Sequence, residues 1–289
     1  ARLEGGRRLA PATSVASRYA LEQTRIFDEQ PNPEEQPIID RLFPQIRLSS
    51  FSSTLIRDTR GDPLDPVRGS FVTMDGAVAA RAIGSEVGFV KTLLKAYLYR
   101  RLPRSPRLVF AGGGMLGLAR GLPIDCSTGR AASSPACADP LPSDRVDRVT
   151  DLPASERFYA GGDSTVRGFA LDRLGTRGTI DEHGFPTGGH ALLIFNAELR
   201  ARLWGALGAV GFTDLGNVFE RVSAMDLGKL RGSVGVGVRY GSPIGPIRVD
   251  LGFKLSRFRF LTGRLLDDGV TPETRLEPRT ALHISLGQS

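Results

Sequence analysis

The sequence predicts an all-β protein, specifically part of an antiparallel transmembrane β-barrel. Three observations lead to this prediction: apolar and polar residues alternate with a period of two, most alternating segments exceed ten residues, and tight turns contrast with a few long connections. A period of two places successive side chains on opposite faces of a strand. Strands of about 9–11 residues suit a tilted crossing of the hydrocarbon layer, and membrane barrels combine short turns with long loops.

Ten candidate strands follow from the alternation. They cover residues 13–28, 45–59, 69–83, 88–101, 107–119, 189–204, 206–219, 229–241, 245–258 and 279–288. A large soluble sandwich would alternate in the same way, because period two reports two faces and not which solvent each face meets. Strand length favours the membrane, as do aromatic residues near strand ends. These aromatic residues are Tyr97, Tyr99, Trp204, Phe219, Tyr240 and Phe260.

Composition and charge narrow the class of protein. The 289 residues include 35 glycines and 19 prolines, and the net charge is +7. Lysine and arginine are spread along the chain without a run of five, so nucleic acid is not an expected partner. No apolar run reaches the ~18–20 residues of a membrane-spanning helix. The first residues carry no apolar signal segment, so we expect this chain to be an interior or C-terminal part of a longer protein.

Residues 120–188 form the longest connection, which we interpret as an extracellular loop. A loop of this length in a compact protein is usually functional or disordered. Its best-defined stretch is Phe158–Phe169, where glycines permit turns that residues with a Cβ resist. Arg167 lies in this stretch. A charged residue on a flexible loop ordinarily points to solvent, which is the alternative to a structural role.

The two cysteines, Cys126 and Cys137, flank a segment of small residues in this loop. Two nearby cysteines on an exposed loop of an envelope protein usually pair, so we expect a disulfide; two free thiols are the alternative. No neighbouring histidine or cysteine completes a metal site with them.

Motifs for catalysis or cofactor binding are weak. Residues 112–117 fit G-x-G-x-x-G, but the dinucleotide fingerprint needs a helix to follow, and Gly121 and Pro123 interrupt one. We interpret these glycines as part of a barrel wall. No G-x-S-x-G elbow accompanies the three histidines, and metal ligands are not clustered. We therefore expect no enzyme, no cofactor and no metal site.

Two acids on neighbouring predicted strands are candidate partners for Arg167. Glu198 lies on the polar face of its strand, and Asp214 lies in the next strand. A guanidinium is always charged and can donate two parallel hydrogen bonds to a carboxylate. Inside a narrow lumen, an unpaired arginine or unpaired acids would be costly, so pairing would hold the loop inward. The alternative is that each acid pairs with a neighbouring arginine of the wall.

An ordered set of motifs begins at Val166-Arg167-Gly168-Phe169. The segments that continue it are Gly188–Leu192, Asn196–Arg200, Gly211–Phe219, Gly235–Tyr240 and Gly245–Asp250, and residues 57–63 precede it. Together these motifs resemble the outer-membrane assembly factor superfamily (BamA/TamA-like, bacterial surface antigen family). The four residues that open the set match the signature of that family's inward-folded loop. The resemblance extends from about residue 45 to the C-terminus.

The resemblance implies a sixteen-stranded barrel of which residues 1–289 are the C-terminal part, about the last ten strands. The motif loop would fold into the lumen, where Arg167 would contact Glu198 and Asp214. The family's working seam lies between first and last strands. The residues of this chain that would belong to the seam strand are Leu282, Ile284, Leu286 and Gly287, the glycine that bends it. One departure is the ending Gln288-Ser289, where family members usually end in an aromatic residue; either the end is clipped or the insertion signal is weak.

The resemblance also implies a function without catalysis. The protein would insert or translocate proteins at the cell outer membrane through the first–last seam. Its partners would be unfolded outer-membrane client proteins, outer-membrane lipid and periplasmic accessory subunits bound through N-terminal domains outside this chain. Two alternatives use the same barrel type: a two-partner secretion transporter, and a membrane barrel appended to a patatin-like phospholipase. A plain diffusion pore is a third.

Overall fold

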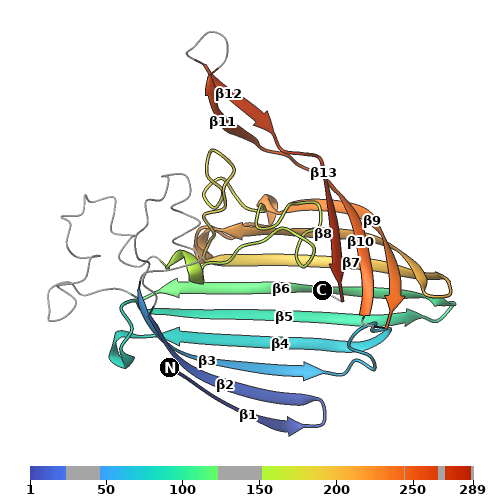
Figure 1. The fold of residues 1–289 in the computed structure, drawn as a ribbon, viewed down its shortest axis with the longest axis horizontal. Helices are drawn as coiled ribbons and strands as arrows, with labels where there is room; N and C mark the ends of the chain where they lie inside the picture. The colour runs from blue at the N-terminus through green and yellow to red at the C-terminus, as the bar shows by residue number, and fades with distance from the viewer. Residues whose placement is uncertain (24–45, 123–151, 244, 266–270, 288–289) are drawn as a thin grey trace. The chain divides into compact units, whose positions relative to one another are not determined.

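The computed structural model describes residues 1–23, 46–122, 152–243, 245–265 and 271–287. Within these ranges the fold is all-β and antiparallel, which confirms the predicted class. The main sheet has eleven strands in the order β1-β2-β3-β4-β5-β6-β7-β8-β9-β10-β13, and a separate two-stranded sheet pairs β11 with β12 (Figure 1). No helix in the described ranges is long and apolar enough to cross a membrane.

The strands of the main sheet are mostly longer than those of ordinary globular proteins. They are β1 (Arg2–Ala10), β2 (Thr13–Gln23), β3 (Arg47–Asp58), β4 (Arg68–Ala79), β5 (Phe89–Leu102), β6 (Ser105–Gly121), β7 (Ala191–Trp204), β8 (Leu207–Phe219), β9 (Arg231–Ser242), β10 (Gly245–Lys254) and β13 (Thr280–Leu286). The separate sheet consists of β11 (Arg259–Leu265) and β12 (Pro272–Leu276). Short 3₁₀ turns occur at Arg81–Ile83, Ala154–Glu156, Val222–Ala224 and Leu227–Lys229.

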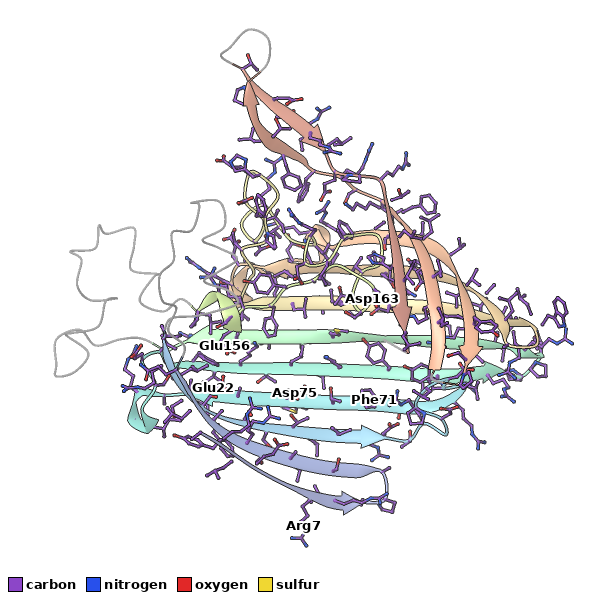
Figure 2. All side chains as sticks on the ribbon, viewed as in Figure 1. Arg7, Glu22, Phe71, Asp75, Glu156 and Asp163 are labelled. Atoms are coloured by element: carbon purple, nitrogen blue, oxygen red, sulfur yellow. The ribbon has the colours of Figure 1, made fainter. Side chains whose placement is uncertain are left out.

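Two differences from the predicted strands concern segments with weak patterns. Strand β1 was not predicted, because four of its nine residues are charged and two are glycine; every residue in it is exposed, and Arg7 projects away from the strands (Figure 2). The segment 259–278 lies outside the ten predicted strands, but it contains the β11–β12 hairpin. The main sheet therefore has eleven strands in the described ranges instead of ten.

The chain divides into two compact units. The first comprises Ala1–Ile56, Met74–Leu93 and Gly117–Arg157. Its strands exchange polar contacts between side chains. The Tyr19 hydroxyl lies 2.9 Å from the Ser49 hydroxyl, and Thr54 donates a 2.6 Å hydrogen bond to Asp75.

The second unit comprises Arg57–Thr73, Leu94–Leu116 and Phe158–Ser289. Its strands have an apolar exposed face and a polar buried face. On β10, Ile247 and Phe253 are 39% and 38% exposed, whereas Arg248 and Asp250 are 2% and 1% exposed. This pattern is the reverse of a soluble sheet and suits a strand whose outer face meets hydrocarbon.

The glycines of the G-x-G-x-x-G segment lie within β6 and precede no helix in the described ranges. A Cβ on Gly113 would lie 2.2 Å from the carbonyl oxygen of Ala96 on β5, and one on Gly114 would lie 2.4 Å from that of Ile194 on β7. Glycine is required here because neighbouring backbones approach closely.

The segment 158–189 packs as an ordered loop within the second unit. Isolated bridges join Phe158 to Gly189 and Ala160 to Leu174. Gly161 adopts a φ of +111°, which favours glycine. The motif at 166–169 is held by tertiary packing, because the loop buries the apolar side chains of Phe158, Ala160, Val166, Phe169, Leu174 and Ile180. The cysteine pair, Cys126 and Cys137, lies outside the described residues.

Candidate functional site

The loop brings Arg167 against strands β7 and β8. In the antiparallel register, Asn196 pairs with Asp214 and Glu198 pairs with Phe212. Residues 196 and 198, two apart on β7, therefore face the same side as residues 212 and 214 on β8. This parity places two carboxylates and an aromatic ring next to one another on the polar face.

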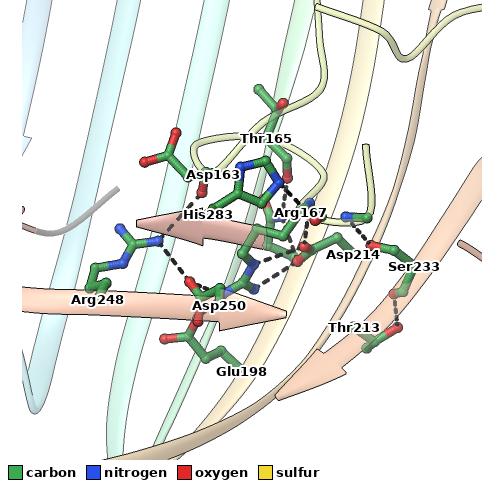
Figure 3. Close-up of polar contacts among 12 residues, drawn as sticks. Asp163, Thr165, Arg167, Glu198, Thr213, Asp214, Ser233, Arg248, Asp250 and His283 are labelled. Atoms are coloured by element: carbon green, nitrogen blue, oxygen red, sulfur yellow. Dashed lines mark hydrogen bonds and ion pairs between the residues drawn. The ribbon is translucent and has the colours of Figure 1, made fainter. Parts of the chain in front are cut away.

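The Arg167 guanidinium is clamped between the two carboxylates (Figure 3). Its Nε and Nη2 donate hydrogen bonds of 2.9 and 2.8 Å to the two oxygens of Asp214, and its Nη1 donates to Glu198. The backbone N–H of Arg167 donates a further 3.0 Å hydrogen bond to Asp214. The guanidinium carbon lies 3.6 Å from the centre of the Phe212 ring, a cation–π contact. Arg167 is 3% exposed and Asp214 is fully buried.

The carboxylates keep Arg167 charged despite its burial. Burial alone lowers the pKa of this guanidinium, but the hydrogen bonds that it donates to Asp214 and the charge of Glu198 outweigh burial and raise its pKa above the usual value. Removing one partner of such a buried pair typically costs ~3–5 kcal/mol, because the remaining charge is left uncompensated. The arrangement therefore suits a structural clamp and not a group that exchanges protons.

Further arginines of the wall surround the same acids. Arg200 contacts Glu198, so this acid pairs with both the loop arginine and a wall arginine. On β10, Asp250 accepts bonds of 2.6 and 3.1 Å from Arg239 and one of 3.4 Å from Arg248. Asp250 also lies 3.9 Å from Nη1 of Arg167. The two readings of the acids, pairing with the loop and pairing with the wall, thus coexist in one network.

The backbone of the motif lies close to β9 and β10 because glycines leave room. The Gly168 N–H donates a 3.1 Å hydrogen bond to the Ser233 hydroxyl, and a Cβ on Gly168 would lie 2.3 Å from the Cβ of Ser233. On the strand side, a Cβ on Gly252 would lie 2.3 Å from the carbonyl oxygen of Arg167. A side chain at either glycine would displace the loop.

Val166 and Phe169 anchor the motif through apolar and cation–π contacts. Both are completely buried. The Phe169 ring centre lies 4.6 Å from the guanidinium carbon of Arg231 and 4.8 Å from Nζ of Lys254. Arg231 also contacts Glu277, which follows β12, so Phe169 is linked to the region of the second hairpin.

The predicted seam residues lie on or next to β13. This strand pairs with β10 from Ile247↔Leu286 to Phe253↔Thr280 and is the last strand in the sheet order. Leu282 and Ile284 are 63% and 71% exposed, and Leu286 is also exposed. Gly287 adopts a φ of +90° and donates a 2.8 Å hydrogen bond to the carbonyl of Pro246.

Sequence reasoning did not single out Asp250, Arg239, Arg248, Ser233 or His283. Strand parity was the available signal, since Arg248 and Asp250 occupy the polar positions of β10. His283 pairs in register with Asp250. Within the described ranges no group of three or more His, Cys, Asp or Glu side chains could hold a metal ion, and the acids of this site already bind arginines.

Comparison with known proteins identifies the family. The family model described as the Omp85 superfamily domain matches residues 1–263. This chain belongs to the Omp85 superfamily. This membership confirms the resemblance seen in the motifs, and the chain is part of an integral β-barrel protein of the cell outer membrane.

Two Omp85 relatives are informative. The outer membrane protein assembly factor BamA of Nitratidesulfovibrio vulgaris is 25% identical over 213 residues, which cover 70% of this chain and 22% of that protein. The crystal structure of BamA from Haemophilus ducreyi lacking POTRA domains 1–3 is similar in fold, with a TM-score of 0.63 and 15% identity. That match covers 98% of this chain and 53% of the solved chain. The chain thus spans about a fifth and about half of these relatives.

Proposed function

We propose that this chain is the C-terminal barrel region of a factor that assembles or inserts outer-membrane proteins without catalysing a reaction. The family supports this function, and the BamA of N. vulgaris carries it in its name. The observation that carries the proposal here is the Arg167 clamp. A motif loop that four strands hold by charge and close backbone contact is a brace, since such contacts resist displacement while other parts of the barrel move.

The proposed working edge is β13. It is paired with β10 on one side and ends the sheet order, so its other side can present backbone N–H and C=O groups. An exposed strand edge can accept another strand by β-augmentation. We propose that a client strand uses this edge within the full-length barrel, with Leu282, Ile284 and Leu286 facing lipid and Gly287 allowing the strand to bend.

The proposed partners follow from this role. They are unfolded outer-membrane client proteins, outer-membrane lipid around the apolar face, and periplasmic accessory subunits that bind elsewhere on the full-length protein. The long connection 120–188 is proposed to be extracellular. A disulfide between Cys126 and Cys137 remains a prediction from the sequence.

Arg167→Ala in the full-length parent tests the proposal. We expect lower levels of folded outer-membrane proteins at equal expression of the parent, because Asp214 and Glu198 lose their shared cation. Arg202→Ala is the matched control, since the Arg202 side chain is 66% exposed and lies 3.7 Å from Asp65. Exposed ion pairs of this kind contribute little to the stability of the folded protein. Normal client levels with Arg167→Ala, together with a large and steady single-channel conductance, would favour a diffusion pore instead.

A further inference from the structure

A histidine on the last strand of the sheet contacts the motif loop. The Nε2 atom of His283, on β13, lies 3.0 Å from the backbone carbonyl oxygen of Arg167 (Figure 3). A carbonyl oxygen can only accept a hydrogen bond, so Nε2 carries the proton and donates. Leu282 and Ile284 on either side of His283 are exposed, which places the imidazole on the polar face by strand parity.

The backbone carbonyl of Arg167 can reach His283 because residue 252 of β10 is glycine and has no side chain in the way. Gly252 pairs with Ala281 of β13, and any Cβ at position 252 would overlap the Arg167 carbonyl at 2.3 Å. Strand β10 thus leaves space for the Arg167 carbonyl at Gly252, and strand β13 supplies its hydrogen-bond donor, His283. His283 also stands opposite Asp250 in the register, next to the network that contacts the Arg167 side chain.

Two of the contacts between Arg167 and the sheet differ in strength. The Arg167 side chain bonds to carboxylates on β7 and β8, which are charge-assisted and buried. The Arg167 carbonyl bonds to β13 through one hydrogen bond from His283. Hydrogen bonds to charged groups are roughly twice as strong as neutral ones, so the contact with β13 is the one that breaks first.

We propose that His283 is a positioning residue that couples the seam strand to the motif loop. While β13 is paired with β10, His283 holds the Arg167 carbonyl. When β13 bends away to admit a client strand, this hydrogen bond breaks, and the loop stays on β7 and β8 through its side chain. The inference rests on the proposed function, because it assigns His283 a part in the movement of the seam.

Amide hydrogen exchange in the full-length parent in lipid nanodiscs tests the coupling. His283→Leu removes the donor at similar volume, whereas His283→Gln keeps an N–H donor near the position of Nε2. With His283→Leu, we expect exchange of both 280–286 and 165–169 to rise about two- to twelvefold, the range for loss of one such bond. His283→Gln should restore values close to the parent. Ser285 lies on the same face of β13, and Ser285→Ala should leave the amide exchange of residues 165–169 unchanged.

A second measurement separates a hydrogen bond from simple packing. Gly252→Ala displaces the Arg167 carbonyl, so in that background His283→Leu should add little to exchange at 165–169. Equal effects in both backgrounds would overturn the proposal, as would parent-like exchange at 165–169 with His283→Leu or failure of His283→Gln to restore it. These outcomes do not depend on client assembly, which Arg167→Ala tests separately. The inference can therefore fail while the proposed function stands.

Discussion

Asp214→Asn should release the motif loop from the wall. Asp214 accepts hydrogen bonds from Nε, Nη2 and the backbone N–H of Arg167, and a 2.9 Å bond from Asn196. Asparagine keeps the volume but removes the charge and one acceptor oxygen. Breaking a buried ion pair costs ~3–5 kcal/mol. Because Glu198 still contacts Arg167, we expect the lower end, about 3 kcal/mol, which raises the open population of the loop roughly a hundredfold.

Amide hydrogen exchange of residues 165–169 measures this opening directly. Exchange from a locally opened state follows the population of that state, so a hundredfold increase is readily resolved. Asp65→Asn is the matched control, because this acid is half exposed and lies 3.7 Å from Arg202. This substitution should leave the amide exchange rates of residues 165–169 unchanged. Parent-like exchange in the Asp214→Asn protein would refute the view that this carboxylate holds the loop.

Two other substitutions test the remaining contacts of the motif. Gly168→Ala should displace the loop from Ser233 and raise amide exchange at residues 165–169. Gly211→Ala should leave that exchange unchanged, because a Cβ on Gly211 would meet nothing within 4 Å. Similar exchange in the two variants would contradict the argument that the Gly168 backbone needs this close approach. Phe169→Leu removes the ring that lies on Arg231, and a loss of ~1–2 kcal/mol in unfolding free energy is expected from denaturant titration. An unchanged unfolding midpoint would count against that contact.

Periodicity was sufficient to predict most of the sheet. Strands β7 to β10 alternate apolar and polar residues because one face is exposed and apolar while the other is buried and polar. Strand β1 escaped prediction because Arg2, Glu4, Arg7 and Arg8 interrupt the apolar positions. The β11–β12 hairpin escaped because it is short and has no continuous alternation.

The site was predictable only in part, for a physical reason. Strand polarity and charge suggested Glu198 and Asp214 as partners of Arg167, and the resemblance to the family implied the same contacts. The structure brings these three side chains together. Alternation alone predicts on which face of the sheet a residue lies. It does not predict the residue opposite on the next strand, because that depends on the register between the two strands. The contact of His283 with the loop depends in addition on how deeply the loop descends, which no local pattern encodes.

A double-mutant cycle on Arg167 and Asp214 tests the central claim most directly. Exchange at residues 165–169 would be measured in the full-length parent, in Arg167→Ala, in Asp214→Ala and in the double variant. If the guanidinium and this carboxylate hold the loop to the wall through each other, the second substitution adds little after the first, so the coupling is large. If the effects of Arg167→Ala and Asp214→Ala on this exchange simply add in the double variant, the claim that the two side chains hold the loop through each other is contradicted.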